Sequence, residues 1–229
     1  MTEKPDLSEK GGRGSLDRRL FIQVTGLRGQ ADALVLGVAL EKAGVKGALY
    51  ADANDPQGWA LACASEDPSF FTGKLRAVLN AKPFDTLGVV PDYAMLGRTY
   101  SIGYEPNLEE WLIEKPQRTL TNPAWPWAVW YPLRRKGEFS QLPVDEQKQI
   151  LKEHSVIGFA FGDADFAHDI RLACHGLDKN DNDFVIGLLG KELYPLSALV
   201  QTMRKTQQTS RWIQNMGPFF VGKAVWQSK

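Results

Sequence analysis

The hydrophobic and polar positions along this chain alternate between strand-like and helix-like spacing, and the same order of predicted strands and helices occurs twice. In the first half, four runs rich in β-branched and other apolar residues predict strands at 19–26, 46–55, 58–65 and 86–105. Between them, 29–44 and 67–82 carry apolar residues at helical spacing. Gly44 predicts the end of the first helix, and Asp67 followed by Pro68 predicts the start of the second. The first half therefore predicts the order β-α-β-β-α-β.

The second half repeats this order. Its predicted strands are 126–135, 166–176, 182–190 and 217–226, and its predicted helices are 144–161 and 193–213. Such a unit covers one face of its sheet with its own helices and leaves the other face in need of a partner. The strands 182–190 and 217–226 show little alternation, which is typical of strands covered on both faces. We therefore expect the two sheets to pack face to face; two modules lying side by side are the alternative.

The repeat sets the predicted fold class and domain organisation. We expect an α+β protein in which tandem ferredoxin-like (βαββαβ) repeats form an α+β barrel within one chain. The polar residues 1–18 predict a disordered N-terminal arm. Residues 19–104 make the N-terminal repeat, and residues 125–229 make the C-terminal repeat. Residues 105–124 contain three prolines and predict a connector with at most one helical turn.

Composition narrows the function classes. Lys plus Arg and Asp plus Glu both total 27, so the chain lacks the basic excess that nucleic-acid binding usually needs. No window approaches the roughly 20 apolar residues of a membrane span, and the polar N-terminus lacks the apolar core of a signal peptide. The two cysteines, Cys63 and Cys174, lie far apart and predict buried free thiols rather than a disulfide or a zinc site. We expect a cytoplasmic protein with no nucleic-acid partner and no membrane span.

One histidine lies on a mostly apolar face of the predicted helix 144–161. His154 shares that face with Ile150, Ile157 and Phe161, which follow a helical spacing. A histidine in such a place is either a satisfied core residue or a ligand to an apolar group. The spacing by itself favours the core residue.

The neighbouring predicted strands carry charged and aromatic residues. Tyr131 and Arg135 lie at the end of the strand 126–135, after Trp130 in the aromatic run WAVWYP. Asp169 and Arg171 alternate on the following strand, so their side chains point to the same side. Aromatic walls, one imidazole and cationic groups would suit a flat apolar cofactor with acidic side groups.

Five ordered pieces of the second half carry a family resemblance. They lie between Trp127 and Trp226 and read WYPLRR, LPVDEQKQILKEHSVIG, GLDKNDNDFVIGLL, LSALVQTMRKTQQT and GPFFVGKA. They resemble the chlorite dismutase and coproheme decarboxylase superfamily of α+β-barrel haem proteins. The resemblance implies haem b or coproheme as the cofactor, and a small-molecule oxidant or a tetrapyrrole as the partner. It also implies a homo-oligomer, commonly a pentamer.

The resemblance further implies roles for single residues. His154 matches the family's haem-iron ligand, and Tyr131 matches a tyrosine that lies beside a porphyrin propionate in coproheme decarboxylases. Arg135 falls where those enzymes carry a basic residue that pairs with a propionate. Independently of the resemblance, the aromatic run leads us to expect Trp130 as an aromatic wall of the cofactor site. Across the haem, where chlorite dismutases carry an arginine, counting places Asp169, and Arg171 follows two residues later.

This departure decides between functions. A carboxylate at the distal place would repel an anionic substrate, so chlorite conversion is not expected unless Arg171 takes that place. The leading hypothesis is peroxide-dependent chemistry at iron ligated by His154, with only one of Asp169 and Arg171 catalytic. One alternative is oxidative decarboxylation of a coproporphyrin-type haem, with Tyr131 as the radical site. Another is a carrier or assembly protein that binds a tetrapyrrole, or nothing, without catalysis.

Overall fold

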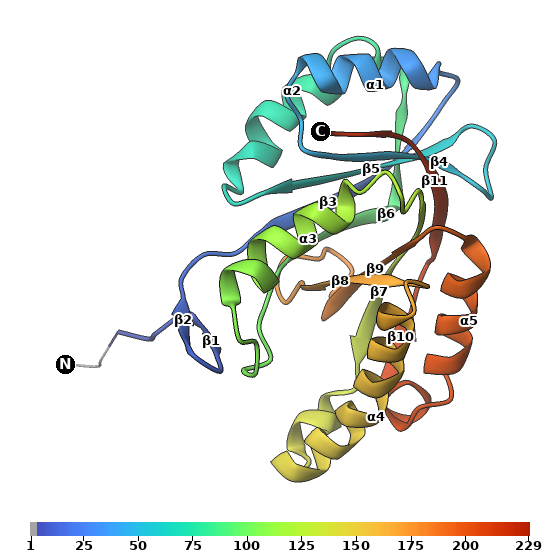
Figure 1. The fold of residues 1–229 in the computed structure, drawn as a ribbon. Coiled ribbons are helices and arrows are strands. Elements are labelled where there is room, and N and C mark those ends of the chain that lie inside the picture. The colour runs from blue at the N-terminus through green and yellow to red at the C-terminus, as the bar shows by residue number, and fades with distance from the viewer. Residues whose placement is uncertain (1–3) are drawn as a thin grey trace.

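The computed structural model describes residues 4–229, and Figure 1 shows the first repeat above the second. The elements of the first repeat are β3 (Phe21–Arg28), α1 (Ala33–Lys42), β4 (Gly47–Asp52), β5 (Gly58–Ser65), the helical turn η1 (Phe71–Leu75), α2 (Arg76–Leu79), η2 (Phe84–Thr86) and β6 (Gly88–Arg98). The order predicted for this half is confirmed. Asp32 begins α1 by accepting hydrogen bonds from the backbone N–H groups of Leu34 and Val35. Gly44 follows the helix at a φ of +59°, a conformation that suits glycine after a helix end.

The second repeat also has the predicted order, with one added strand. Its elements are β7 (Trp127–Arg135), η4 (Gly137–Gln141), α4 (Val144–Asp163), β8 (His168–Ala173), β9 (Phe184–Gly190), α5 (Leu193–Met203), η5 (Gln208–Trp212), β10 (Ile213–Met216) and β11 (Phe220–Gln227). Within the predicted helix 193–213, α5 ends at Met203 and η5 follows as a separate helical turn after residues 204–207. The added strand β10 begins at Ile213 and pairs antiparallel with the end of β7. Within residues 4–229, no helix is both long and apolar enough to cross a bilayer.

The strands of both repeats form one closed ring. The first repeat has the order β4-β5-β3-β6, and the second has the equivalent order β8-β9-β7-β11. The two sheets join where β11 pairs with β4 and where β6 meets β8. The first joint runs from Gly222 to Gln227 on β11, whereas the second consists of the single pair Arg98 and Ala173. The predicted tandem-repeat α+β barrel is confirmed.

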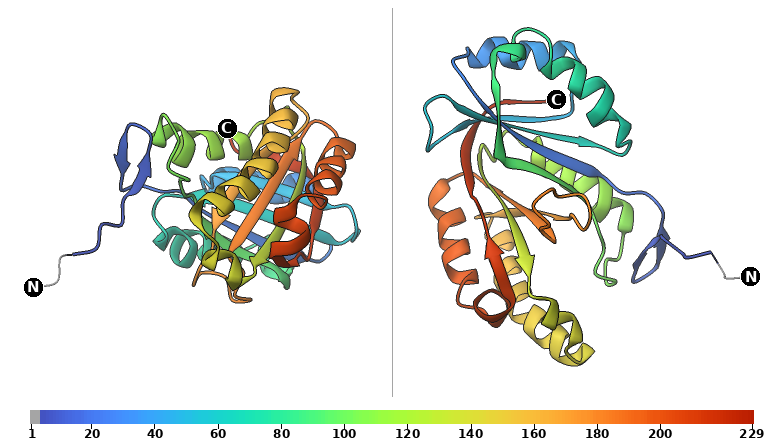
Figure 2. Two further views of the ribbon diagram at one scale, coloured as in Figure 1. Left: turned by 90° about the horizontal axis from the view of Figure 1, so that it is seen from below. Right: turned by 180° about the vertical axis from the view of Figure 1, so that it is seen from behind.

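The barrel interior is the main core. Ile22 and Tyr50 of the first sheet and Trp130 and Leu172 of the second are fully buried in one cluster, so the sheets pack face to face. Outside the ring, α1, η1 and α2 cover the first sheet through a second cluster. A third cluster lies between the second sheet and the helices α4 and α5, and it contains Tyr131. Figure 2 shows these helices on the outer side of the strands.

The segment predicted as a disordered arm contains a hairpin. It consists of β1 (Glu9–Gly11) and β2 (Gly14–Leu16), while residues 1–3 lie outside the described residues. The Glu9 carboxylate fixes the hairpin to the barrel, because it pairs with Arg98 at 2.9 Å and accepts a hydrogen bond from the backbone N–H of Ser101 at 3.0 Å. The local sequence is polar, so the ordered structure of this hairpin depends on contacts with distant residues, which a local sequence pattern cannot indicate.

The predicted connector 105–124 contains more helix than expected. It holds η3 (Glu110–Glu114) and α3 (Lys115–Leu120) in one continuous helical stretch. Pro116 lies where the π-helical turn η3 passes into α3, and the helical stretch continues beyond it to Leu120. Leu112, Ile113 and Leu120 join the interior cluster, and this burial holds the helical stretch against the barrel.

Candidate functional site

Two strands of the second repeat, β7 and β8, carry predicted site residues on one face, and β9 lies between them. Tyr131 of β7 pairs with Ile186 of β9, and Ile186 pairs with Arg171 of β8. Asp169 occupies the adjacent row of this face, opposite Leu188. Directly paired residues point to the same side of a sheet, and adjacent strands lie about 4.8 Å apart. Tyr131 and Arg171 therefore lie roughly 10 Å apart across the face that α4 and α5 cover.

Trp130 does not belong to this face, contrary to the expectation of an aromatic wall there. It precedes Tyr131 on the same strand, so it points to the opposite side of the sheet. Its ring is fully buried in the barrel interior, over Gly187 of β9, where an added Cβ would lie 2.5 Å from the ring. Trp130 is a core residue of the barrel.

The helix above the site face is weakly packed. Ile150 is the only residue of α4 that is fully buried, although this helix is 20 residues long. The shorter α5 buries Leu196, Leu199 and Met203 against the same sheet. In Figures 1 and 2 the first turns of α4, in yellow, extend beyond the strands. An unusual share of the α4 surface is thus free to contact another group.

The sheet residues below α4 also remain accessible. The side chains of Asp169 and Arg171 are 42% and 35% exposed, although they lie on the helix-covered face. The Arg171 Nε lies 2.9 Å from the Asp169 carboxylate, so the two residues form an ion pair. Both candidates for the distal position therefore lie on the same face of the sheet. The charge of each side chain is partly balanced by the charge of the other.

His154 has an unsatisfied and uncharged imidazole. Its Nδ1 is buried, and within residues 4–229 it has no hydrogen-bond partner. Burial, and then the positive charges of Arg135 and Arg171, lower the pKa of His154 from 6.5 to about 4. The ring is neutral at neutral pH, and a neutral imidazole offers a lone pair to a metal.

The other two histidines of the chain have partners. His168 forms a hydrogen bond of 2.8 Å with Asp165 and stacks on Trp125 with 3.5 Å between ring centroids. His175 lies 3.2 Å from Asp183 on the surface. Buried polar atoms without partners are rare and costly in folded proteins, which makes His154 the unusual histidine.

Arg135 lies at the end of the site face with free donors. Its guanidinium lies over the rings of Phe139 and Phe184, at 4.5 and 4.9 Å from their centroids. Its Nε is buried and lacks a hydrogen-bond partner among the described residues, and burial lowers its pKa. An acidic group placed beside this guanidinium would supply the missing acceptor.

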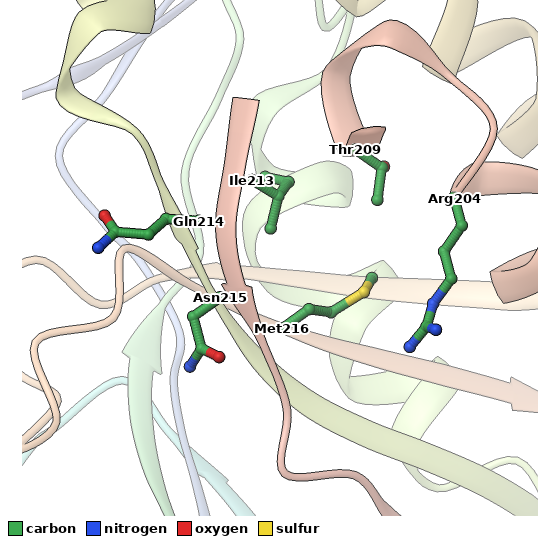
Figure 3. A pocket seen from close by; sticks show the side chains of 6 residues that line it. All are labelled: Arg204, Thr209, Ile213, Gln214, Asn215 and Met216. Atoms are coloured by element: carbon green, nitrogen blue, oxygen red, sulfur yellow. The ribbon is translucent and has the colours of Figure 1, made fainter. Parts of the chain in front are cut away.

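Tyr131 is buried beside a second cation. It stacks on Phe219 with 4.5 Å between centroids, and Arg204 lies over Phe219 at 5.8 Å. Burial, and then the charge of Asp169, raise the pKa of Tyr131, so its phenol stays protonated at neutral pH. A cavity of about 270 Å³ lies beside Arg204, at the end of α5. Its lining residues are Arg204, Thr209, Ile213, Gln214, Asn215 and Met216 (Figure 3). Because His154 and Asp169 do not line it, this cavity is a neighbour of the site and not its centre.

Sequence reasoning missed Tyr100. Its ring packs against Phe184 with 5.7 Å between centroids. Burial raises its pKa, while the charges of Arg171 and Arg135 lower it, so this phenol lies with the two arginines. Tyr100 comes from the first repeat and reaches the site only because the ring closes at β6 and β8, so no local pattern could have indicated it.

Comparisons with known proteins agree with the fold. The chlorite dismutase family model matches residues 94–225, somewhat more than half of the chain. A heme-binding protein from Thermus thermophilus is similar, with a TM-score of 0.69, 18% identity, and 91% of this chain and 92% of that one covered. The chlorite dismutase of Candidatus Nitrospira defluvii, solved with imidazole, has a TM-score of 0.68 and 13% identity at the same coverage. No curated protein matches the sequence.

Proposed function

Because the chain belongs to the chlorite dismutase family, we propose that it binds a haem-type tetrapyrrole between α4 and the outer face of the second sheet. In this proposal His154 is the protein ligand to the iron. The observation that carries it is the neutral imidazole of His154 on a weakly packed helix, with a buried Nδ1 that has no hydrogen-bond partner among residues 4–229. A neutral imidazole has a lone pair that an iron can accept.

The surrounding residues suit such a group. The buried Nε of Arg135 has no acceptor within the described residues, and Arg204 lies beside the Tyr131–Phe219 pair, so the site offers two cations to acidic side groups. Ile157 and Phe161 of α4 are only partly buried and would contact a flat apolar ring. Haem b and coproheme both satisfy these requirements.

The proposed chemistry is oxidation with a peroxide. The bound iron would supply the redox chemistry, and the protein would manage protons and charge. Asp169 is positioned to hold a proton or pass it on, while Arg171 supplies a positive charge at the same place. Their ion pair leaves little net charge on this side, which favours a neutral oxidant such as hydrogen peroxide over the anion chlorite.

The placement of Tyr131 supports a second candidate, oxidative decarboxylation of the bound porphyrin itself. Its phenol is buried on the site face, near the cation Arg204, as a residue acting on a carboxylate side group would be. Mass spectrometry of the bound porphyrin after peroxide addition distinguishes the two candidates. Loss of carbon dioxide supports decarboxylation, whereas an unchanged porphyrin with turnover of an added reductant supports a peroxidase. Binding without either reaction supports the carrier alternative.

The test of the proposal is a haemin titration of the apo-protein followed by absorption spectroscopy. The wild type is expected to shift the Soret band with a one-to-one end point, and His154→Ala is expected to change the band position and weaken binding. His168→Ala is the matched control, because His168 points to the other side of β8 from Asp169 and is held by Asp165 and Trp125. Absence of a Soret shift in the wild type contradicts the proposal, and equal spectra for His154→Ala and wild type contradict the ligand assignment.

A further inference from the structure

The helical turn η5 is joined to α4 directly beside His154. The carboxylate of Glu153 accepts a hydrogen bond of 2.9 Å from the backbone N–H of Gln207. Glu153 precedes His154 on α4, and Gln207 precedes Gln208, the first residue of η5. The same bond therefore brings Gln208 close to His154, although the two residues are far apart in the sequence.

Gln208 is buried, which is unusual for a glutamine. The residue is 8% exposed, whereas Gln207 before it is exposed. The side-chain oxygen Oε1 of Gln208 is buried and has no hydrogen-bond partner among residues 4–229. A buried carbonyl oxygen of this kind has lost its bonds to water without gaining others, so it is costly to the fold and rare. This oxygen is available to a donor that lies nearby.

Few donors can match the unpartnered oxygen of Gln208. In the part of the chain that the structure describes, six buried side-chain atoms lack a hydrogen-bond partner. Two of them are oxygens, and the second belongs to Tyr50 in the barrel interior. Of the four nitrogens, one lies in the barrel interior and one beside the N-terminal segment. The nitrogens of His154 and Arg135 remain as donors on the side of the second sheet where η5 lies.

The two ends of η5 separate these two donors. The guanidinium of Arg135 lies over the ring of Phe139 at 4.5 Å from its centroid. Phe139 packs edge-on against Trp212, the last residue of η5. The hydrogen bond to α4 is at the other end of the turn, where Gln208 lies. The position of Gln208 therefore favours His154 as its partner.

We propose that Gln208 is the positioning residue of the iron ligand, whose Oε1 accepts a hydrogen bond from the Nδ1–H of His154 when the Nε2 of that imidazole binds iron. The part played by iron rests on the proposed function. A histidine bound to a metal through one nitrogen almost always donates the N–H of the other, and this bond fixes the tautomer and the orientation of the ring. Without haem neither atom has a partner among the described residues, so the haem-free protein gives up stability to keep the acceptor in place.

The acceptor is an amide, and this sets the charge of the ligand. A carboxylate would attract the Nδ1 proton strongly and give the imidazole anionic character, whereas an amide oxygen leaves the ring neutral. The positive charges of Arg135 and Arg171 act on His154, and a neutral ring does not neutralise them. Both guanidinium groups therefore remain available to acidic side groups of a tetrapyrrole.

Urea unfolding of the haem-free protein tests whether the oxygen of Gln208 is unpaired. Gln208→Met keeps a similar volume but removes the amide, so its unfolding midpoint is expected to lie above that of the wild type. Gln207→Met is the matched control, because the Gln207 side chain is exposed and its backbone N–H still binds Glu153. A Gln208→Met midpoint at or below that of the wild type would show that the amide already has a partner without haem, and it overturns the proposal.

Resonance Raman spectroscopy of the ferrous, haem-loaded protein tests the hydrogen bond itself. A hydrogen bond at Nδ1 makes the imidazole a stronger ligand, so the iron–histidine stretching frequency is expected to fall in Gln208→Met. Gln208→Glu supplies a stronger acceptor and is expected to raise the frequency above that of the wild type, while Gln207→Met should match the wild type. Equal frequencies in the wild type and both Gln208 variants contradict the role of Gln208 alone. Absence of a Soret shift on adding haemin contradicts the proposed function, and the role of Gln208 toward iron fails with it.

Discussion

The substitution His154→Leu should stabilise the haem-free protein, and more so at acidic pH. The wild type buries an imidazole Nδ1 that has no hydrogen-bond partner in the described part of the chain, and leucine removes this atom while keeping a similar volume. The folded state binds a proton at His154 with a pKa of about 4, whereas the unfolded chain binds it near 6.5. Between these values the unfolded chain holds more protons, so the wild type loses stability as the pH falls from 6.5 towards 4, and its full stability is present above 6.5.

The size of the effect follows from these two pKa values. One unit corresponds to about 1.4 kcal/mol, so the full shift is worth about 3 kcal/mol once the pH reaches 4. At pH 5 the expected loss is about 2 kcal/mol, and at pH 7 it is close to zero. Leucine does not titrate, so the difference in unfolding free energy between His154→Leu and wild type should grow by these amounts.

Urea unfolding of both apo-proteins at several pH values between 4 and 7 measures this difference, because the other titrating groups cancel in it. His175→Leu is the control, since it removes an exposed histidine and leaves His154 in place. Parallel stability curves for wild type and His154→Leu would show that His154 is not held neutral in the fold. With haem added, the order should reverse, because only the wild type gains free energy from the iron bond.

Three further predictions concern other parts of the molecule. Trp130→Ala should cost about 3–5 kcal/mol of stability through the cavity it leaves. The Soret position of the folded, haemin-loaded variant should nevertheless equal that of the wild type. A shifted Soret band would show that Trp130 contacts the cofactor after all. Asp169→Asn should release Arg171 and tighten fluoride binding to the haem-loaded protein several-fold at neutral pH, measured by absorption titration; unchanged binding would mean that the ion pair does not restrain Arg171. Val156 and Phe159 are 59% and 62% exposed on α4, and we expect them to contact another copy of the chain; Phe159→Glu should then reduce the mass measured by light scattering, and an unchanged mass would locate the oligomer interface elsewhere.

The sequence predicted the features that depend on local periodicity. The β-α-β-β-α-β order of each half follows from the spacing of apolar residues, and two such sheets have one way to cover both faces within a chain. The shared direction of Asp169 and Arg171 follows from strand alternation in the same manner. Strand alternation also predicts that Trp130 and Tyr131 point to opposite faces, because adjacent residues of a strand cannot share a face.

The remaining features depend on contacts between distant segments. Tyr100 and Lys115 lie near Arg171 only because β6 meets β8 and α3 packs at that joint. The ion pair between Asp169 and Arg171 was not predicted, since alternation gives direction but not distance. The hairpin at residues 9–16 depends on the bond between Glu9 and Arg98, which are far apart in the sequence.

Because β6 and β8 share a single residue pair, the barrel is held together by fewer strand-to-strand contacts at this joint than at the opposite one. The joint of β11 with β4 is the strong side, while the opposite joint relies on contacts outside the strand ladder. The connector supplies one such contact through Leu112 and Ile113, and Glu9 supplies another through Arg98. An N-terminal segment that carries no site residue thus acts as a clasp, and removing it would loosen the ring beside the residues on which its chemistry depends.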